Sequence, residues 1–159
     1  MIPIDVVGVR LEVPSNQPVL LLRERGGSRY LPIWIGVAEA TAIAMTESGM
    51  EPPRPLTQDL VRLVLEAAKV DLLRVEISDL AEGVFYADMV LSNGVVISAR
   101  PSDAVAVALR TGSETLVAEH VLEAAGVPAP LDEDTEVEAF REFLESVTPE
   151  EFGGRESQS

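Results

Sequence analysis

The segment ARPSDAVAVALR, residues 99–110, places an arginine and two short polar side chains ahead of a run of small and branched apolar residues. Ser102 is suited to accept from the amides of a first helical turn, and Asp103 complements the positive end of that helix. Neither role needs Arg100, which adds positive charge where free amides already favour anions. The segment therefore predicts either a phosphate-binding corner or an exposed ion pair between Arg100 and a nearby carboxylate.

A second polar cluster, RPLTQDL at residues 54–60, repeats this order of side-chain types. Arg54 precedes a predicted helix, Thr57 is suited to cap it, and Asp59 lies in its first turn. Capping alone does not require an arginine in each cluster. We therefore expect both clusters to line one cleft, with the candidate residues Arg54, Thr57, Gln58, Asp59, Arg100, Ser102 and Asp103.

These clusters belong to a chain that repeats itself. VLEAAKV at 64–70 returns as VLEAAGV at 121–127, and IGVAEATAIAM at 35–45 resembles ARPSDAVAVAL at 99–109, which aligns Glu39 with Asp103. The repeats predict an internal duplication of a unit of three strands followed by two helices, over roughly residues 1–70 and 71–130.

The pattern of apolar and turn residues predicts an α+β fold in a single domain, with a mixed or antiparallel sheet packed with helices. Gly26-Gly27 and Asn93-Gly94 are hairpin signals, and the prolines of MEPPRPL separate the two halves. The predicted strands span 3–13, 19–25, 29–35, 72–80, 84–91 and 95–100, and the predicted helices span 37–48, 56–69, 102–111 and 118–126.

Composition limits the kinds of site the chain can hold. The 159 residues contain no cysteine, which excludes disulfides, thiolate nucleophiles and zinc–thiolate sites. The first residues, MIPIDVVGVRLEV, place Asp5 and Arg10 inside an apolar run and lack a basic leader, so we expect a cytoplasmic protein with no membrane segment. The net charge of −15 predicts that any contact with nucleic acid is local rather than spread over a basic surface.

Residues 131–159 form an acidic tail with ten acidic residues against Arg141 and Arg155. Its apolar residues predict one short amphipathic helix that docks on the body or on a neighbouring subunit. The alanine-rich helices of the body also predict self-association, most simply as a two-fold dimer.

Two isolated side chains have ordinary structural explanations. His120 lies in an apolar helical segment, where a solvated histidine, or one at the edge of the core, is the expected case. Trp34 lies in the predicted strand 29–35, and we expect it in the core or at an interface rather than as a base-stacking platform.

Four segments, RYLPIWIGVAEATAIA, PPRPLTQDL, EGVFYADMVL and SARPSDAVAVALR, resemble the bifunctional nuclease (BFN) domain family in order and spacing, over roughly residues 1–130. The resemblance implies an α+β fold and a nuclease activity on both DNA and RNA. The chain departs from the family at Gln58, because the family motif reads RPLTHDL. If that histidine is a general base, this chain has either lost activity or uses a carboxylate with metal-bound water.

We therefore predict a nuclease in which Arg54 and Arg100 bind phosphate. Asp59 and Asp103 are the expected ligands of a divalent metal, Mg²⁺ or Mn²⁺, and Glu39 is a third candidate ligand whose ordinary role is a charge in a first helical turn. The alternative is a non-catalytic regulatory module that binds a nucleotide or small anion at the same helix ends. Gln58 and the acidic surface favour that alternative.

Overall fold

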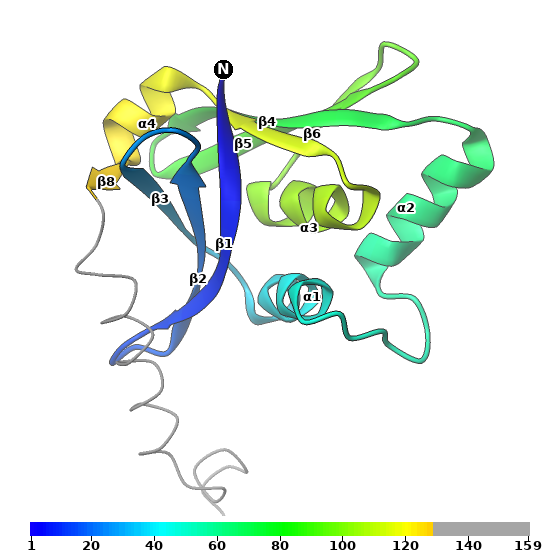
Figure 1. Cartoon of the computed structure of the whole chain (residues 1–159), viewed down its shortest axis with the longest axis horizontal. Coiled ribbons are helices and arrows are strands. Elements are labelled where there is room, and N and C mark those ends of the chain that lie inside the picture. The colour runs from blue at the N-terminus through cyan, green and yellow to red at the C-terminus, as the bar shows by residue number, and fades with distance from the viewer. Residues whose placement is uncertain (129–159) are drawn as a thin grey trace, which may run out of the picture.

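The computed structural model describes residues 1–128, so the predicted tail helix in 131–159 lies outside the described part of the chain. The described residues form one eight-stranded mixed sheet packed with four helices, in the strand order β6-β5-β4-β7-β1-β2-β3-β8 (Figure 1). This arrangement confirms the predicted α+β class. None of the helices in residues 1–128 is long and apolar enough to span a bilayer.

The first half of the chain forms an antiparallel meander followed by two helices. Its elements are β1 (Ile2–Glu12), β2 (Gln17–Glu24), β3 (Arg29–Trp34), α1 (Val37–Glu47) and α2 (Thr57–Ala68). Gly26 adopts a φ of 76° in the turn between β2 and β3, a conformation that glycine adopts without steric cost. The Gly-Gly signal therefore predicted this hairpin correctly.

The second half begins with a second antiparallel meander. Its elements are β4 (Leu72–Ala81), β5 (Val84–Leu91), β6 (Val96–Ala99), α3 (Pro101–Thr111), β7 (Glu114–Val117), α4 (Glu119–Ala125) and β8 (Val127–Pro128). The meander matches the predicted three strands, whereas β7 and β8 were not predicted. The superposition of the two halves stays a prediction.

β7 joins the two meanders at the centre of the sheet. It pairs in parallel with β4 and antiparallel with β1. A four-residue strand of this kind carries little periodicity, and its pairing depends on partners that are distant in the chain. This is why the sequence pattern did not indicate it.

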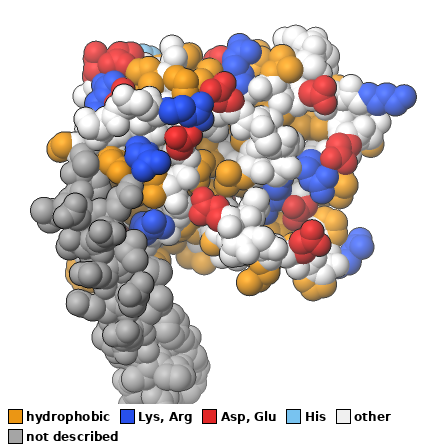
Figure 2. Space-filling model, in the orientation of Figure 1, with side chains coloured by type: hydrophobic (Ala, Val, Ile, Leu, Met, Phe, Trp, Pro, Cys, Tyr) orange, Lys and Arg blue, Asp and Glu red, His pale blue; other side chains and the backbone are white. Residues whose placement is uncertain are grey.

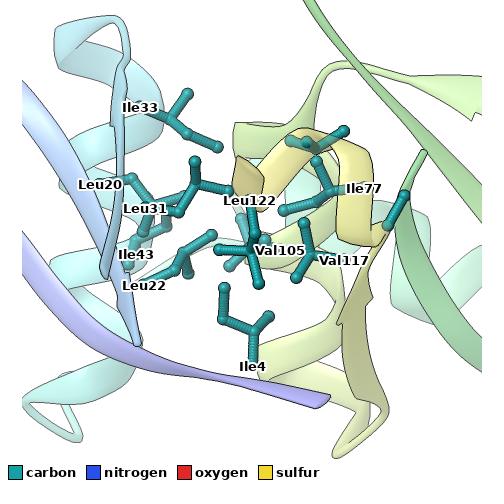
Figure 3. Packing of buried hydrophobic residues seen from close by; sticks show 13 residues of the cluster. Ile4, Leu20, Leu22, Leu31, Ile33, Ile43, Ile77, Val105, Val117 and Leu122 are labelled. Carbon is teal, nitrogen blue, oxygen red and sulfur yellow. The ribbon is translucent and has the colours of Figure 1, made fainter. Parts of the chain in front are cut away.

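Side chains from both halves fill one core. In the β2–β3 pair Leu20 lies opposite Ile33 and Leu22 opposite Leu31, which places four core residues on one face of the sheet. Figure 3 shows these residues pointing toward Ile77 of β4 and toward other buried side chains of the second half: Val105, Val117 and Leu122. The shared core makes the two halves one domain.

α3 occupies the centre of the helical layer. It contacts α1, α2, β4 and β5, and the side chains of residues 104–108 are buried. The segment is a helix although the alternating period of its AVAVA run also suits a strand. The small side chains of this run allow neighbouring helices and strands to approach α3 closely from several sides. The packing of α3 fixes the position of its N-terminal end, which follows β6 directly.

α2 packs less deeply, at the edge of the helical layer (Figure 1). Val61 and Leu65 are partly buried against the second core cluster around Leu72. On another side of the helix, Leu60 and Val64 are exposed. α2 therefore has an apolar surface that the described residues leave open.

Candidate functional site

An ion pair joins the first turns of α1 and α3. Arg100 lies immediately before α3, and its Nη2 is 2.6 Å from Oε1 of Glu39 on α1. Its Nε donates to Oδ2 of Asp103 at 2.8 Å. The hydrogen bond and charge of Asp103, followed by the charge of Glu39, raise the pKa of Arg100 above its already high ordinary value. Arg100 is therefore a permanent cation.

The Glu39 carboxylate is held in place by its surroundings. Glu39 is only 8% exposed. A Cβ atom at Gly36, the residue before α1, would collide with this carboxylate, so the absence of a side chain at Gly36 provides the room it needs. Arg100 in turn compensates the charge of a carboxylate that is nearly removed from water.

Gln58 brings α2 into the same group of contacts. Its Nε2 donates to Oδ1 of Asp103 at 3.3 Å, while Arg100 donates to the other oxygen of that carboxylate. Glu39, Gln58, Arg100 and Asp103 thus form one contact group, which we call the Arg100 cluster. All four were candidate site residues in the sequence, and the structure brings them together.

Arg100 and Ser102 also border a hollow of about 290 Å³ in the protein surface. The hollow lies between the end of β3 and the turn that joins β4 to β5, and Trp34 and Phe85 contribute to its lining. The Arg100 side chain is 68% exposed although two of its nitrogens are engaged. Its third nitrogen, Nη1, has no hydrogen-bond partner within residues 1–128, which leaves one edge of the guanidinium for a ligand.

The predicted helix caps do not form. α3 begins at Pro101, one residue earlier than predicted, so Arg100 takes the N-cap position and Ser102 lies inside the first turn. α2 likewise begins at Thr57 with Leu56 as its N-cap residue, and neither helix has a side-chain hydrogen bond from its N-cap residue. The capping roles predicted for Ser102 and Thr57 are therefore wrong. Proline at the first helical position suits the start of α3 without a side-chain cap. In α2, Thr57 is itself the first helical residue.

Asp59 has a partner of its own. Its Oδ1 accepts from Nε of Arg110 at 2.7 Å, and its Oδ2 accepts from the backbone N–H of Leu56 at 2.8 Å. Arg110 was not among the candidate residues that the sequence indicated, and its side chain is only 5% exposed. Burial by itself raises the pKa of Asp59, but the Leu56 amide and Arg110 outweigh burial and lower the pKa below the ordinary value. Asp59 is thus engaged within the helix packing.

The remaining candidates lie outside these contacts. Arg54 is exposed in the segment before α2 and forms no hydrogen bond or ion pair with any described residue. Thr57 is also exposed. His120 on α4 is exposed, as predicted for a solvated histidine, and its Nε2 lies 3.2 Å from Oδ1 of Asp79.

The carboxylates do not form a metal site in this arrangement. Glu39 and Asp103 both contact Arg100, whereas Asp59 is bound to Arg110. Within residues 1–128, no three histidine, aspartate or glutamate side chains are grouped closely enough to hold a metal ion. The residues as placed here do not fit the expected Mg²⁺ or Mn²⁺, and we derive no chemical step through one.

Trp34 does not lie in the core, and its place at an interface stays a prediction. It is 52% exposed rather than buried in the core, and its indole Nε1 donates to Oε2 of Glu12 at 2.6 Å. The preceding residue, Ile33, is buried, and successive strand residues point to opposite faces. Which of the two faces is buried depends on the packing of the sheet, so the sequence did not decide the exposure of Trp34.

Comparisons with known proteins add two findings. The family model described as Bifunctional nuclease domain matches residues 20–130. Two Mycobacterium tuberculosis proteins, "Uncharacterized protein MT1877" of strain CDC 1551 / Oshkosh and "Uncharacterized protein Rv1829" of strain ATCC 25618 / H37Rv, are each 52% identical over 158 residues. Each alignment covers 94% of this chain and 96% of the relative.

Proposed function

Since the chain belongs to the bifunctional nuclease domain family, we propose that it is a nuclease that hydrolyses phosphodiester bonds in DNA and RNA. The observation that carries the choice of site is the exposed Arg100 cation at the N-terminal end of α3, on the border of a hollow. Phosphoryl transfer depends mainly on positioning and on stabilising the charge of the phosphate oxygens. Arg100 is placed for both tasks.

Arg100 would bind the phosphate through its open edge. Asp103 and Glu39 hold the Nε and Nη2 side of the guanidinium, so the side chain is oriented before a ligand arrives. The free backbone amides of the first turn of α3 add positive partial charge at the same point. A phosphate on Nη1 would therefore keep both ion pairs intact.

Asp103 is the proposed general base. It is the carboxylate beside the phosphate-binding arginine that still has access to solvent, since Glu39 is nearly buried. Gln58 and Arg100 each donate to one of its oxygens and fix its orientation. In this proposal Asp103 accepts a proton from the attacking water as the water oxygen bonds to phosphorus. The bond from phosphorus to the leaving sugar oxygen breaks, and that oxygen takes a proton from solvent. Glu39 positions Arg100.

The charge of the protein limits how nucleic acid is bound. Figure 2 shows acidic and basic side chains interspersed on one face, without an extended basic area. Few phosphates can then be neutralised at once, and the affinity should depend only weakly on salt, with a log–log slope of about −0.7 per contacted phosphate for a single strand.

A cleavage assay on the purified protein tests this proposal. Labelled single- and double-stranded DNA and RNA are incubated with the wild type, Arg100→Ala, Asp103→Asn and the control Arg62→Ala, with and without EDTA. Arg62 is a suitable control because it forms an exposed ion pair with Glu66 on α2, away from the hollow. We expect the control to cleave normally, Arg100→Ala to lose roughly tenfold or more, and Asp103→Asn to lose most activity.

The proposed site is rejected if both site variants cleave like Arg62→Ala at an unchanged melting temperature. The EDTA arm reports whether a divalent ion takes part, since the carboxylates as placed do not group around one.

A non-catalytic module that binds nucleotides or small anions is the second candidate. Gln58 favours it, because glutamine occupies the motif position of a histidine and contacts Asp103, yet cannot exchange a proton near neutral pH. Binding without cleavage in the wild type, together with cleavage in Gln58→His, would support this candidate. Cleavage by the wild type excludes it.

We also propose that the protein is a two-fold dimer. The apolar surface of α2 supports this, since Leu60, Leu63 and Val64 are exposed at helical spacing and lie on one side of the helix. Light scattering of the wild type beside Val64→Glu is the test. A wild-type monomer at micromolar concentration contradicts the proposal.

A further inference from the structure

We propose that the hollow beside Arg100 binds one unstacked nucleotide of a single-stranded nucleic acid. Its phosphate lies on Arg100 and Ser102, and its base lies against Trp34 and Phe85. The proposal rests on the proposed function, because it names the substrate class of the same site. It adds to the proposed function a binding role for Trp34 and a preference for single-stranded over double-stranded nucleic acid.

Ser102 supplies the first argument. The residue is only 6% exposed, and its hydroxyl makes no hydrogen bond with any residue of the described chain. Within the same residues no fully buried side-chain oxygen or nitrogen lacks a partner, so the Ser102 hydroxyl must reach solvent. The space that Ser102 lines is the hollow. A buried residue thus presents an unpartnered hydroxyl beside the Arg100 cation, which suits a phosphate oxygen.

Trp34 supplies the second argument. An indole that is 52% exposed leaves a large apolar surface in water at the edge of the hollow. The hydrogen bond from its Nε1 to Glu12 holds the ring in one orientation. Phe85, the other aromatic lining residue, is partly buried and packs against the core. Stacking of a base on these side chains would strengthen binding of the nucleic acid. This holds for all of the bases, because every base has an aromatic face.

The size of the hollow favours a single strand. Its volume of about 290 Å³ is near the lower limit for a small-molecule site. Bases within a duplex are stacked on their neighbours and must leave the stack before they can enter such a site. Unstacking a base costs less free energy in a single strand, because no base pair has to be broken. A duplex also relies on a broad basic surface for its two backbones, and the net charge of −15 opposes that.

The acidic neighbours predict which phosphates are accepted. Three carboxylates contact residues that line the hollow: Glu39 and Asp103 contact Arg100, and Glu12 contacts Trp34. The single positive charge of Arg100 offsets one of these three negative charges. A phosphodiester carries a single negative charge, whereas inorganic phosphate and nucleoside triphosphates carry more. The site should therefore prefer an internal diester of a chain over highly charged free ligands.

The fluorescence of Trp34 reports on this site directly, because it is the only tryptophan of the chain. Full-length protein is titrated with a ten-nucleotide single-stranded DNA, with the corresponding duplex and with inorganic phosphate. We expect the single strand to quench the fluorescence, the duplex to bind at least tenfold more weakly, and phosphate to leave the signal unchanged. Equal affinity for the duplex, or a response to phosphate alone, overturns the proposal.

Variants separate stacking from simple charge. Binding of a labelled single strand is followed by anisotropy for Trp34→Ala, Trp34→Phe and the control Tyr86→Ala, with melting temperatures to verify folding. Tyr86 is an exposed aromatic residue on β5 that does not line the hollow. Trp34→Ala should weaken binding about fivefold or more, while Trp34→Phe and Tyr86→Ala should retain wild-type affinity within about twofold. Equal affinity of all four proteins refutes the role of Trp34.

This outcome is independent of cleavage. Selective, Trp34-dependent binding by a protein that cuts nothing would support the nucleotide site and reject the nuclease. Cleavage of single strands and duplexes alike, unaffected by Trp34→Ala, would support the nuclease and reject the nucleotide site.

Discussion

The N-terminal ends of α2 and α3 carry the same arrangement in sequence but differ in the structure. Asp59 and Asp103 are each the third residue of their helix. Asp59 accepts from a backbone amide of its own helix and from the buried Arg110, whereas Asp103 accepts from the exposed Arg100 and from Gln58. The same carboxylate position thus serves packing in one helix, and in the other it holds an arginine that lines the hollow. The difference lies in the arginine that each carboxylate meets.

Arg110 ties three helices together. In addition to Asp59 on α2, its guanidinium donates to the carbonyl oxygen of Ala42 on α1 at 3.0 Å and to that of Ala106 on α3 at 2.8 Å. Every one of its three nitrogens is therefore engaged. In Arg100 only Nε and Nη2 are engaged by described residues, and Nη1 is open to a ligand. We therefore assign phosphate binding to Arg100 and a role in helix packing to Arg110.

The largest expected effect follows from this contrast. Arg110→Ala leaves Asp59 without its cation and the Ala42 carbonyl without its donor, so we expect a loss of about 3 kcal/mol in the free energy of unfolding. Arg100→Ala should cost less, about 1 kcal/mol, because its guanidinium is 68% exposed although it also offsets the charge of the nearly buried Glu39. Urea denaturation of both variants measures the difference. Similar losses for the two would show that the helix ends are not specialised as described.

The next effect depends on pH. The pKa of Asp59 is lowered in the folded protein, so its ionised form stabilises the fold above the ordinary pKa of about 3.9, and this contribution disappears as the pH falls through the lowered value. Asp59→Asn should therefore be less stable than the wild type at pH 7, and the gap should narrow below about pH 4.

Melting temperatures of both proteins between pH 3 and 7 measure this gap. The pKa of Asp5 is also lowered, chiefly by its hydrogen bond from Arg25, but this contribution is common to both proteins and cancels in the difference. A gap that stays constant down to pH 3 contradicts the assigned role of Asp59.

The smallest effect concerns the two hydroxyls at these helix ends. Neither Thr57 nor Ser102 caps its helix, so Thr57→Ala and Ser102→Ala should each change the free energy of unfolding by less than about 0.5 kcal/mol. A lost cap would cost about 1 kcal/mol. Ser102→Ala should nevertheless weaken binding of a single strand. Thermal unfolding and anisotropy on the same samples distinguish the two roles.

The candidate site was only partly predictable from the sequence. The pairing of Arg100 with Asp103 could be foreseen, because residues three positions apart at a helix start are neighbours. Glu39 was indicated by its equivalence to Asp103 in the repeat, but its contact with Arg100 required α1 to pack against α3. Arg110 gave no comparable signal, since it lies in the last turn of its helix and its partner is 51 residues away in the chain.

Local features were determined by the sequence alone: the hairpins at Gly26 and Gly94 and the four helices of the described chain, each starting within one residue of its predicted position. Each depends on backbone preferences and on contacts within a few positions. The tertiary structure alone decided the central place of β7, the exposure of Trp34, and which of two similar aspartates meets a buried arginine. These features depend on partners far apart in the chain, and only the packing of the two halves around one core brings them together.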